Sequence, residues 1–545
     1  MKKIISLLLA LAMVMGLAAC GKSGGQGAQS GEQKTLTIGI QIRANLEDLY
    51  NNDLTRYIEE KTGYKLEFVT FATSASEWRS QVNTMIASGE RLPDIMFGFG
   101  WNEDERYTYG RDGYLMDLLP YVTGDQAKAY RERVAELYGE DYFDEMIRYL
   151  KSPDGAMYGF PTIGFSETAG VTTATYINKT WLDNLGLEMP TNWEELVEVL
   201  RAFKTQDPNR NGKADEIPAI GKVEPSNTTT GGAARDLPQW LLNNFLYIDD
   251  SKFFNSEDGE LYFPYITDEY REGLIALKGL VDEGLLSTLC WTMAQNSELA
   301  AIVGPASEEA IVGVFSGAIT IINAENPVMY EYEPLPPLNY APLVPQIPNA
   351  YIYITEDCQD VEAAMDLLLA VTDEEGSMRV RYGVEGTHWE WNEDDTQAGK
   401  GVRTLINWST GSHSVNWGVN YGYLLRFHSQ ETPYHSILNP EKVWSNTATD
   451  KSNEYSRLYH EQAEKANPEE VVNKLTYTAE ESDAIGNIKM EVLTFAKESR
   501  AKFATGVYDP TDDTTWQWYI DTLNEMGLQT YLTNSQSAWD RMNNG

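Results

Sequence analysis

Apolar and polar positions alternate with two different periods in the first folded part of the chain. Three short, largely apolar runs have the length and composition of buried strands: residues 36–42, 65–71 and 94–99. The segments between them, residues 46–61 and 76–87, repeat apolar side chains at helical spacing and are each followed closely by a glycine, which is typical of amphipathic helices. Strands that alternate with helices predict an α/β fold with a largely parallel sheet.

The pattern farther along the chain is more helical. Four segments have helical spacing: residues 191–204, 236–245, 268–284 and 361–371. The first of them opens with Thr191 and Glu194, which predicts a capping box at its start. Two further apolar runs, residues 311–315 and 350–354, predict strands, so the α/β alternation continues beyond the first sheet.

The N-terminus has the pattern of an export and tethering segment. A basic start followed by the apolar run of residues 4–17 is typical of a signal peptide. The run is too short for a membrane-spanning helix, which needs roughly 20 residues. The run leads through small residues to Cys20, a sequence that resembles a bacterial lipobox. That resemblance implies a signal peptide over residues 1–19 and a diacylglycerol on the Cys20 sulfur; ordinary signal cleavage beside a chance cysteine is the alternative. Residues 20–34 then form a flexible tether, and only the lipid contacts the membrane.

Composition and charge narrow the possible functions. Hydrophobic residues make up 42% and charged residues 23% of the 545 residues, which argues against a disordered chain and against a polytopic membrane protein. Acids outnumber bases 82 to 42, and the formal net charge of −40 repels phosphate backbones, so no nucleic-acid partner is expected. The same charge favours a monomer. Three cysteines and five histidines are too few for a disulfide framework and give no zinc-ligand spacing.

The loop after the helix at 191–204 has the spacing of a calcium-binding loop. Oxygen-bearing side chains stand at its relative positions one, three, five and nine, namely Asp207, Asn209, Asn211 and Asp215. Gly212 lies at position six, where such a loop turns sharply, and Lys213 at position seven can offer its backbone carbonyl. Position twelve is Pro218 in place of glutamate, so we expect Glu216 to supply the missing carboxylate. A turn rich in Asn, Asp and Gly without a metal is the alternative.

Several segments together resemble one protein family. These segments are Met85–Ile95 (MIASGERLPDI), Tyr158–Pro161 (YGFP), Tyr176–Leu182 (YINKTWL), Arg381–Trp389 (RYGVEGTHW) and Phe503–Gly506 (FATG). Their order and spacing are similar to those of the extracellular solute-binding proteins of bacterial ABC importers, above all the long, lipoprotein-type sugar-binding subfamily of Gram-positive bacteria. The resemblance extends over residues 36–542, essentially the whole chain after the tether.

The resemblance implies an α/β fold of two discontinuous lobes, the type II arrangement of periplasmic binding proteins, with the ligand cleft between them. On this basis we expect residues 35–160 and 357–405 in the first lobe, and residues 161–356 in the second, with 406–545 as its C-terminal helical region. The resemblance also implies that an oligosaccharide is captured by hinge closure and delivered to permease subunits at the outer face of the cell membrane, without bond cleavage. Sugar-binding relatives carry a calcium in the loop that corresponds to residues 207–216 of this chain. We expect a calcium bound here to be structural.

Aromatic side chains supply candidates for sugar contacts, because a flat apolar ring with a polar edge suits the face of a sugar. The chain has 14 Trp and 32 Tyr, most of which must pack in the core. Trp101, Trp240 and Trp291 lie near the ends of predicted elements, and Trp417 lies in a polar run. Trp389 and Trp391 follow the turn at 383–386 and would share one face of an extended segment, so all six are candidate platforms. Asn45, Glu385 and Arg426 are candidates for hydroxyl or carboxylate contacts, with ordinary surface or interlobe bonds as the alternative.

Two other functions stay open at this point. A secreted polysaccharide-active enzyme would need two carboxylates at a suitable distance, and 82 acidic residues offer too many pairs for the sequence to test this. The other alternative keeps the fold but makes the protein a peptide-binding or sensor-type binding protein. Direct binding of oligosaccharides against oligopeptides separates that alternative from sugar capture.

Overall fold

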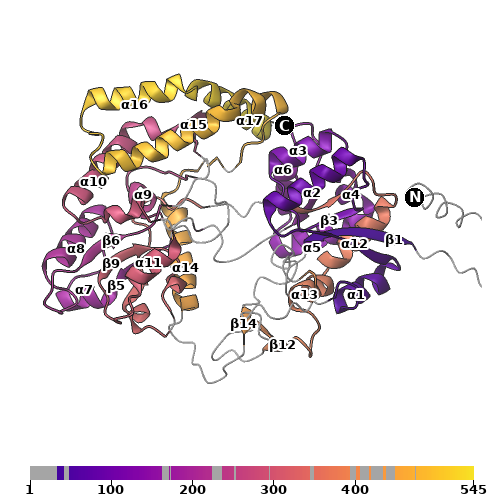
Figure 1. Cartoon of the computed structure of the whole chain (residues 1–545), viewed down its shortest axis with the longest axis horizontal. Coiled ribbons are helices and arrows are strands. Elements are labelled where there is room, and N and C mark those ends of the chain that lie inside the picture. The colour runs from indigo at the N-terminus through magenta and orange to yellow at the C-terminus, as the bar shows by residue number, and fades with distance from the viewer. Residues whose placement is uncertain are drawn as a thin grey trace, which may run out of the picture.

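The chain folds into two α/β bodies that lie beside each other (Figure 1). The computed structural model describes residues 34–41, 48–162, 171, 174–223, 236–250, 253–293, 295–323, 325–343, 349–392, 401–404, 416–418, 434–436, 448–469, 471–472 and 474–544. We call the body of residues 34–162 and 349–382 lobe 1, and the body of residues 174–343 and 448–544 lobe 2, because each has its own hydrophobic core. Cys20, Asn45 and Arg426 lie outside the described residues.

Lobe 1 is built on a five-stranded sheet with the order β2-β1-β3-β11-β4. Its strands are β1 (Thr35–Gln41), β2 (Lys65–Phe71), β3 (Ile95–Phe97), β4 (Phe160–Thr162) and β11 (Asn349–Ile354). Strand β1 pairs in parallel with β2 and β3, whereas β11 runs antiparallel to both β3 and β4. Four strands therefore point one way, which confirms the largely parallel sheet. The reversed strand is the one with which the chain re-enters lobe 1 from lobe 2.

Helices cover this sheet (Figure 1). They bury their apolar faces in its core. They are α1 (Asp53–Thr62), α2 (Ala75–Ser88), α3 (Glu103–Arg111), α4 (Leu119–Thr123), α5 (Lys128–Tyr138), α6 (Tyr142–Leu150), α12 (Val361–Thr372) and α13 (Glu374–Tyr382). The hydrophobic pattern predicted that this first helix begins at residue 46, but α1 begins at Asp53. The cause is local: the Asn52 side chain accepts a hydrogen bond of 3.0 Å from the backbone N–H of Thr55 and caps the helix there.

Lobe 2 has a four-stranded sheet with the order β10-β5-β9-β6 and a separate β7-β8 hairpin. The strands are β5 (Thr175–Asn178), β6 (Ile217–Ile220), β7 (Asn255–Glu257), β8 (Glu260–Tyr262), β9 (Val312–Ser316) and β10 (Tyr332–Pro334). Strand β9 is parallel to β6, and β5 is antiparallel to both β9 and β10. As in lobe 1, the reversed strand is the first one after the chain enters the lobe.

The helices of lobe 2 come from its middle part and from the C-terminus. They are α7 (Lys179–Leu185), α8 (Trp193–Thr205), α9 (Leu237–Leu242), α10 (Asp268–Asp282), α11 (Asn296–Val303), α14 (Ala448–Ala466), α15 (Ala479–Ala504), α16 (Asp513–Glu525) and α17 (Leu528–Asn544). The capping box predicted at Thr191 and Glu194 is wrong by one residue. Asn192 caps α8 by accepting from the N–H of Glu195, and the Glu195 carboxylate accepts from the backbone and hydroxyl of Thr191.

The chain passes between the lobes after β4, after β10 and a third time between α13 and α14. Val171 on the first crossing pairs with Leu343 on the second in an antiparallel bridge, so the two crossings lie side by side. The expected boundary at residue 160 falls at the start of β4, whereas the one at residue 356 would place β11 in lobe 2, although β11 pairs with β3 and β4 of lobe 1. A further sheet of β12 (Trp389–Asn392), β13 (Gly401–Thr404) and β14 (Tyr434–Ser436) stands apart from both main sheets. Within the described ranges, none of the helices has the length and apolar composition to cross a membrane.

Candidate functional site

Two candidate tryptophans lie in the core of lobe 1. Trp101, at the carboxyl end of β3, is almost fully buried and packs edge-on against Tyr353, with ring centroids 4.6 Å apart. Trp417 is also buried; its indole N–H donates to the Thr55 hydroxyl at 3.0 Å, and its ring packs against Phe97 at 5.0 Å. Both rings therefore stabilise lobe 1 in this arrangement.

The other candidate tryptophans are spread over the molecule. Trp389 is buried against Tyr382, and its indole N–H donates to the carbonyl of Gly383 at 3.1 Å. The exposed Glu385 pairs with Trp389 through the backbone in an isolated β-bridge. Trp391 lies on the same strand, β12. Trp240 is part of the lobe 2 core and Trp291 packs on that core partly exposed. Among the residues that the structure describes, the predicted ligand contacts do not gather around one cavity; the role of Asn45, Trp391 and Arg426 stays a prediction.

A cavity of about 460 Å³ lies where the two lobes meet, a size suited to a small-molecule ligand. Its walls combine aromatic rings with charged and amide side chains: Arg148, Tyr149, Tyr247, Leu343, Asn467, Glu469, Val471, Lys474, Trp539, Met542 and Asn543. The first two belong to α6 of lobe 1, and the others come from lobe 2, including the crossing residue Leu343. The cavity is therefore shaped by how the lobes sit against each other.

Lys474 joins the two lobes at this cavity. Its ammonium group forms an ion pair of 2.9 Å with Glu103 at the start of α3 and donates a hydrogen bond to the carbonyl of Tyr149 at the end of α6, both in lobe 1. Burial lowers the pKa of Lys474, since its side chain is only 7% exposed, while the Glu103 charge opposes that shift. The segment that carries it is anchored in lobe 2, where the Tyr477 hydroxyl bonds to Ser535 at 2.9 Å.

The second crossing is fixed to lobe 2 beside the cavity. The Asn467 side chain accepts from the backbone N–H of Ala341 at 2.9 Å and donates to its carbonyl at 2.8 Å. The Tyr459 hydroxyl donates to the carbonyl of Pro342 at 2.7 Å. Leu343, the next residue, lines the cavity and pairs with Val171. A change in the angle between the lobes must therefore bend the chain close to the cavity.

Three aromatic side chains dominate the cavity walls. Trp539 on α17 packs in the lobe 2 core. Tyr149 and Tyr247 are each only 7% exposed. Neither belongs to the hydrophobic core of lobe 1 or of lobe 2, as far as the structure describes these cores. Sequence reasoning missed all three, because they come from segments far apart in the chain. Within those segments no local motif distinguishes them from packing residues.

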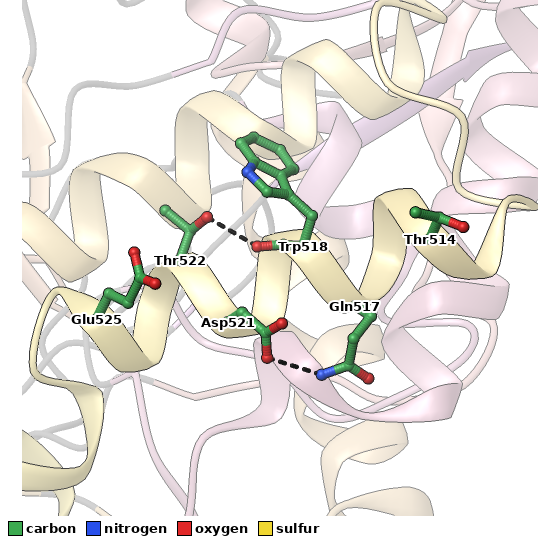
Figure 2. A pocket seen from close by; sticks show the side chains of 6 residues that line it. All are labelled: Thr514, Gln517, Trp518, Asp521, Thr522 and Glu525. Carbon is green, nitrogen blue, oxygen red and sulfur yellow. Dashed lines mark hydrogen bonds between the residues drawn. The ribbon is translucent and has the colours of Figure 1, made fainter.

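A second hollow, of about 490 Å³, lies on the outer face of α16 (Figure 2). Its described lining comes from that one helix: Thr514, Gln517, Trp518, Asp521, Thr522 and Glu525. The polar groups are engaged within the helix, since Gln517 donates to Asp521 at 2.9 Å and Thr522 to the carbonyl of Trp518 at 2.7 Å. Only one lobe contributes to this hollow, so the interlobe cavity is the stronger candidate.

The loop predicted to bind calcium adopts a compact turn. The side-chain oxygens of Asp207, Asn209 and Asn211 point inward and accept from backbone N–H groups of the loop, and Gly212 has a φ of 73°. One carboxylate oxygen of Glu216 is buried and has no hydrogen-bond partner in the described part of the chain. Burial raises the pKa of Glu216, and the charges of Asp215 and Asp207 add to this shift. No three His, Cys, Asp or Glu side chains in the described ranges converge as a ready metal site. The unpartnered Glu216 oxygen nevertheless fits the role expected of it.

The sequence matches the family described as bacterial extracellular solute-binding protein over residues 43–378. It is 26% identical over 311 residues to the fructooligosaccharide ABC transporter substrate-binding protein FusA of Streptococcus pneumoniae serotype 4, a match that covers 54% of each chain. It is 28% identical over 291 residues to lipoprotein LipO of Bacillus subtilis, covering 52% of this chain and 51% of LipO. The chain thus spans about half the length of the curated relatives it matches.

The fold is shared with solved structures over nearly its whole length. An HMO-binding, ABC-transporter-associated solute-binding protein from Bifidobacterium longum infantis superposes with a TM-score of 0.72 at 20% identity, covering 94% of this chain and 99% of that chain. This likeness confirms the predicted two-lobe α/β fold. The matched family consists of binding proteins and not of enzymes. Since its model matches more than half of the sequence, the chain belongs to the bacterial extracellular solute-binding protein family.

Proposed function

We propose that the protein is the substrate-binding component of an ABC importer and captures a carbohydrate between lobes 1 and 2. The observation that carries this proposal is the interlobe cavity, in which Tyr149 from one lobe and Tyr247 and Trp539 from the other stand among charged and amide side chains. Aromatic faces suit the C–H faces of sugar rings, and the polar groups suit their hydroxyls. The relative named for fructooligosaccharide and the structural neighbour named for HMO support a carbohydrate as ligand.

Capture would follow from closure of the lobes on the ligand. The side-by-side crossings at Val171 and Leu343, together with the passage between α13 and α14, connect the lobes, and the lobes can rotate about this connection. A ligand that contacts both walls of the cavity favours the closed arrangement, because only there does it make all its contacts. The closed protein would then dock on permease subunits, and no bond of the sugar is broken.

The proposal is tested by thermal unfolding with a ligand panel. We expect at least one oligosaccharide among 1-kestose, lacto-N-tetraose, xylotriose, galactotriose and trigalacturonic acid to raise the melting temperature, since a ligand at 100 times its Kd stabilises the folded state by about 2.7 kcal/mol. Oligopeptides should leave it unchanged. A shift by peptides alone would contradict sugar capture, and release of reducing ends from a polysaccharide would establish the enzyme alternative.

We also propose that Cys20 carries the lipid that holds the protein at the outer face of the cell membrane. The lipobox-like sequence before Cys20 supports this, as does the likeness to a protein named lipoprotein LipO. Mass spectrometry of the N-terminal peptide of the membrane-bound protein should find Cys20 as the first residue with a diacylglycerol on its sulfur. A mature N-terminus with an unmodified Cys20 would contradict the anchor.

Calcium in the loop at 207–216 is the third part of the proposal. The residues that would hold it are Asp207, Asn209, Asn211, the Lys213 carbonyl, Asp215 and Glu216, and the unpartnered Glu216 oxygen supports this assignment. Chelation should lower the melting temperature of the wild-type protein. Asp207→Ala should abolish that response, whereas the nearby exposed control Asp183→Ala should keep it. A melting curve that chelation does not move would remove calcium from the account.

A further inference from the structure

Tyr247 is held in place by contacts that leave its hydroxyl unused. It follows α9, where the Asn243 side chain accepts from the N–H of Ile248 at 3.0 Å, and the Tyr247 carbonyl accepts from the Asn255 side chain at 2.6 Å. Its ring meets that of Tyr340 edge-on, with centroids 6.2 Å apart at 86°. Backbone and ring are thus both fixed by neighbours that make no bond to the hydroxyl.

The Tyr247 hydroxyl is buried and has no hydrogen-bond partner among the described residues. A buried polar group without a partner destabilises the fold, and most such groups in proteins are paired. Tyr247 lines the interlobe cavity, so a ligand bound there as the lobes move could supply the missing partner. This makes the hydroxyl different from Lys474 in the same wall, whose ammonium is already bonded to Glu103 and to a backbone carbonyl.

The charges near Tyr247 disfavour an anionic partner. Asp249, two residues away, is buried, and its charge raises the pKa of Tyr247 further after the main effect of burial. Glu469 adds a second carboxylate to the cavity wall. Lys474 is neutralised by its ion pair with Glu103, and Arg148 is exposed, with its guanidinium 5.0 Å from the centre of the Tyr149 ring. A carboxylate placed against Tyr247 would meet like charge, and the described cavity walls offer no free buried cation to balance it.

We propose that the Tyr247 hydroxyl is a specificity contact that recognises a hydroxyl group of a neutral sugar unit in the interlobe cavity. The inference rests on the proposed carbohydrate function and deepens it. It assigns one hydrogen bond to one atom, and it favours neutral sugars over uronic acids at this position. A ligand that lacks the matching hydroxyl leaves Tyr247 unpaired and should bind less well.

The test compares two tyrosines that differ in their relation to the cavity. Tyr247→Phe removes the unpaired hydroxyl, and Tyr340→Phe makes the same chemical change on the adjoining ring, which is not among the described cavity walls. Binding of the panel oligosaccharides is measured by calorimetry for the wild type and both variants. We expect Tyr247→Phe to weaken binding about tenfold, the loss of one hydrogen bond of about 1.4 kcal/mol. Tyr340→Phe should bind as the wild type does.

The melting temperature without ligand distinguishes a ligand contact from a structural hydrogen bond, because the two roles predict opposite effects of Tyr247→Phe. Because the hydroxyl is unpaired without ligand, Tyr247→Phe should leave the melting temperature unchanged or raise it. A lower melting temperature would overturn the proposal, since it would mean that the hydroxyl is already bonded.

The remaining outcomes separate this proposal from the function on which it rests. If the wild type binds a sugar and Tyr247→Phe binds it equally well, the specificity contact is overturned while the carbohydrate function stands. If trigalacturonic acid binds more tightly than galactotriose, the preference for a neutral unit is overturned. If the wild type binds no panel carbohydrate, both proposals fall together.

Discussion

Asp236 offers a test of the electrostatics inside lobe 2. Its carboxylate is buried at the start of α9, where it caps the helix by accepting from the N–H of Gln239 at 2.9 Å. Asp250 lies in the same buried group and forms an ion pair with Arg500, which donates to it at 2.6 Å. Burial raises the pKa of Asp236 to about 6, with the Asp250 charge adding to the shift and the Arg500 charge opposing it.

The size and sign of the effect follow from this pKa. In the unfolded chain the carboxyl titrates near 3.8, so folding raises its pKa by about two units, or about 3 kcal/mol. A raised pKa means that the folded state binds the proton more tightly. The stability from this site is therefore fully present below about pH 4 and is lost as pH rises through about 6. Asp236→Asn stays neutral and is an equally good helix cap. We expect it to gain about 2–3 kcal/mol over the wild type at pH 7.5 and much less at pH 4.5.

Urea unfolding at pH 4.5 and 7.5 measures this difference directly. Asp512→Asn is the matched control, because Asp512 also caps a helix, α16, but is exposed. Hydrogen bonds from Thr515 lower the pKa of Asp512, so its contribution is present at neutral pH and lost as the pH falls. The control should therefore lose stability at pH 7.5, opposite in sign to Asp236→Asn. An Asp236→Asn effect of the same size at both pH values would refute the reasoning.

Two further predictions concern the junction of the lobes. Lys474→Met removes the ion pair with Glu103 and should lower the free energy of unfolding by about 1–3 kcal/mol. The loss stays moderate because the half-exposed Glu103 carboxylate can be solvated again. A double-mutant cycle with Glu103→Gln in urea unfolding should give a clear coupling energy, and a value near zero would contradict the ion pair. Asn467→Ala removes both bonds to Ala341 and should lower stability by about 1–2 kcal/mol. It should also speed hydrogen exchange in the second crossing, and unchanged exchange there would contradict its role.

The sequence pattern predicts the elements of the fold better than their ends. Strand β2 occupies residues 65–71 as predicted, and α1 ends where Gly63 adopts a φ of 78°. The starts of α1 and α8 were wrong because an asparagine, Asn52 or Asn192, supplied the cap instead of the residue that the pattern favoured. Several neighbouring polar residues can cap a helix, and only the backbone geometry decides among them.

The pairing of strands has no local signal at all. The apolar run at 350–354 predicts a strand, but nothing in it shows that β11 returns to lobe 1 and lies reversed between β3 and β4. The lobe boundaries expected from the family resemblance placed these residues in lobe 2, so neither the pattern nor the resemblance predicted this pairing.

The candidate site was less accessible to sequence reasoning for the same physical reason. Trp101 was predicted because it follows a predicted strand and Trp417 because it lies in a polar run, yet both rings pack in the lobe 1 core and the Trp417 indole is bonded within it. Their role toward a ligand stays a prediction. The cavity takes Tyr149, Tyr247 and Trp539 from α6, from the chain after α9 and from α17. Their convergence depends on two lobes and a C-terminal helix, which no spacing within the sequence reveals.

The measurement that tests the central claim most directly is calorimetric titration of a panel oligosaccharide into the wild type and into two tryptophan variants. Trp539→Leu removes the aromatic face from the cavity, and Trp518→Leu removes the exposed ring on the outer face of α16. The account predicts one sugar bound per protein and binding weakened roughly fivefold or more by Trp539→Leu. Trp518→Leu should bind as the wild type does. Equal binding by a folded Trp539→Leu variant, or no sugar binding by the wild type, would contradict capture in the interlobe cavity.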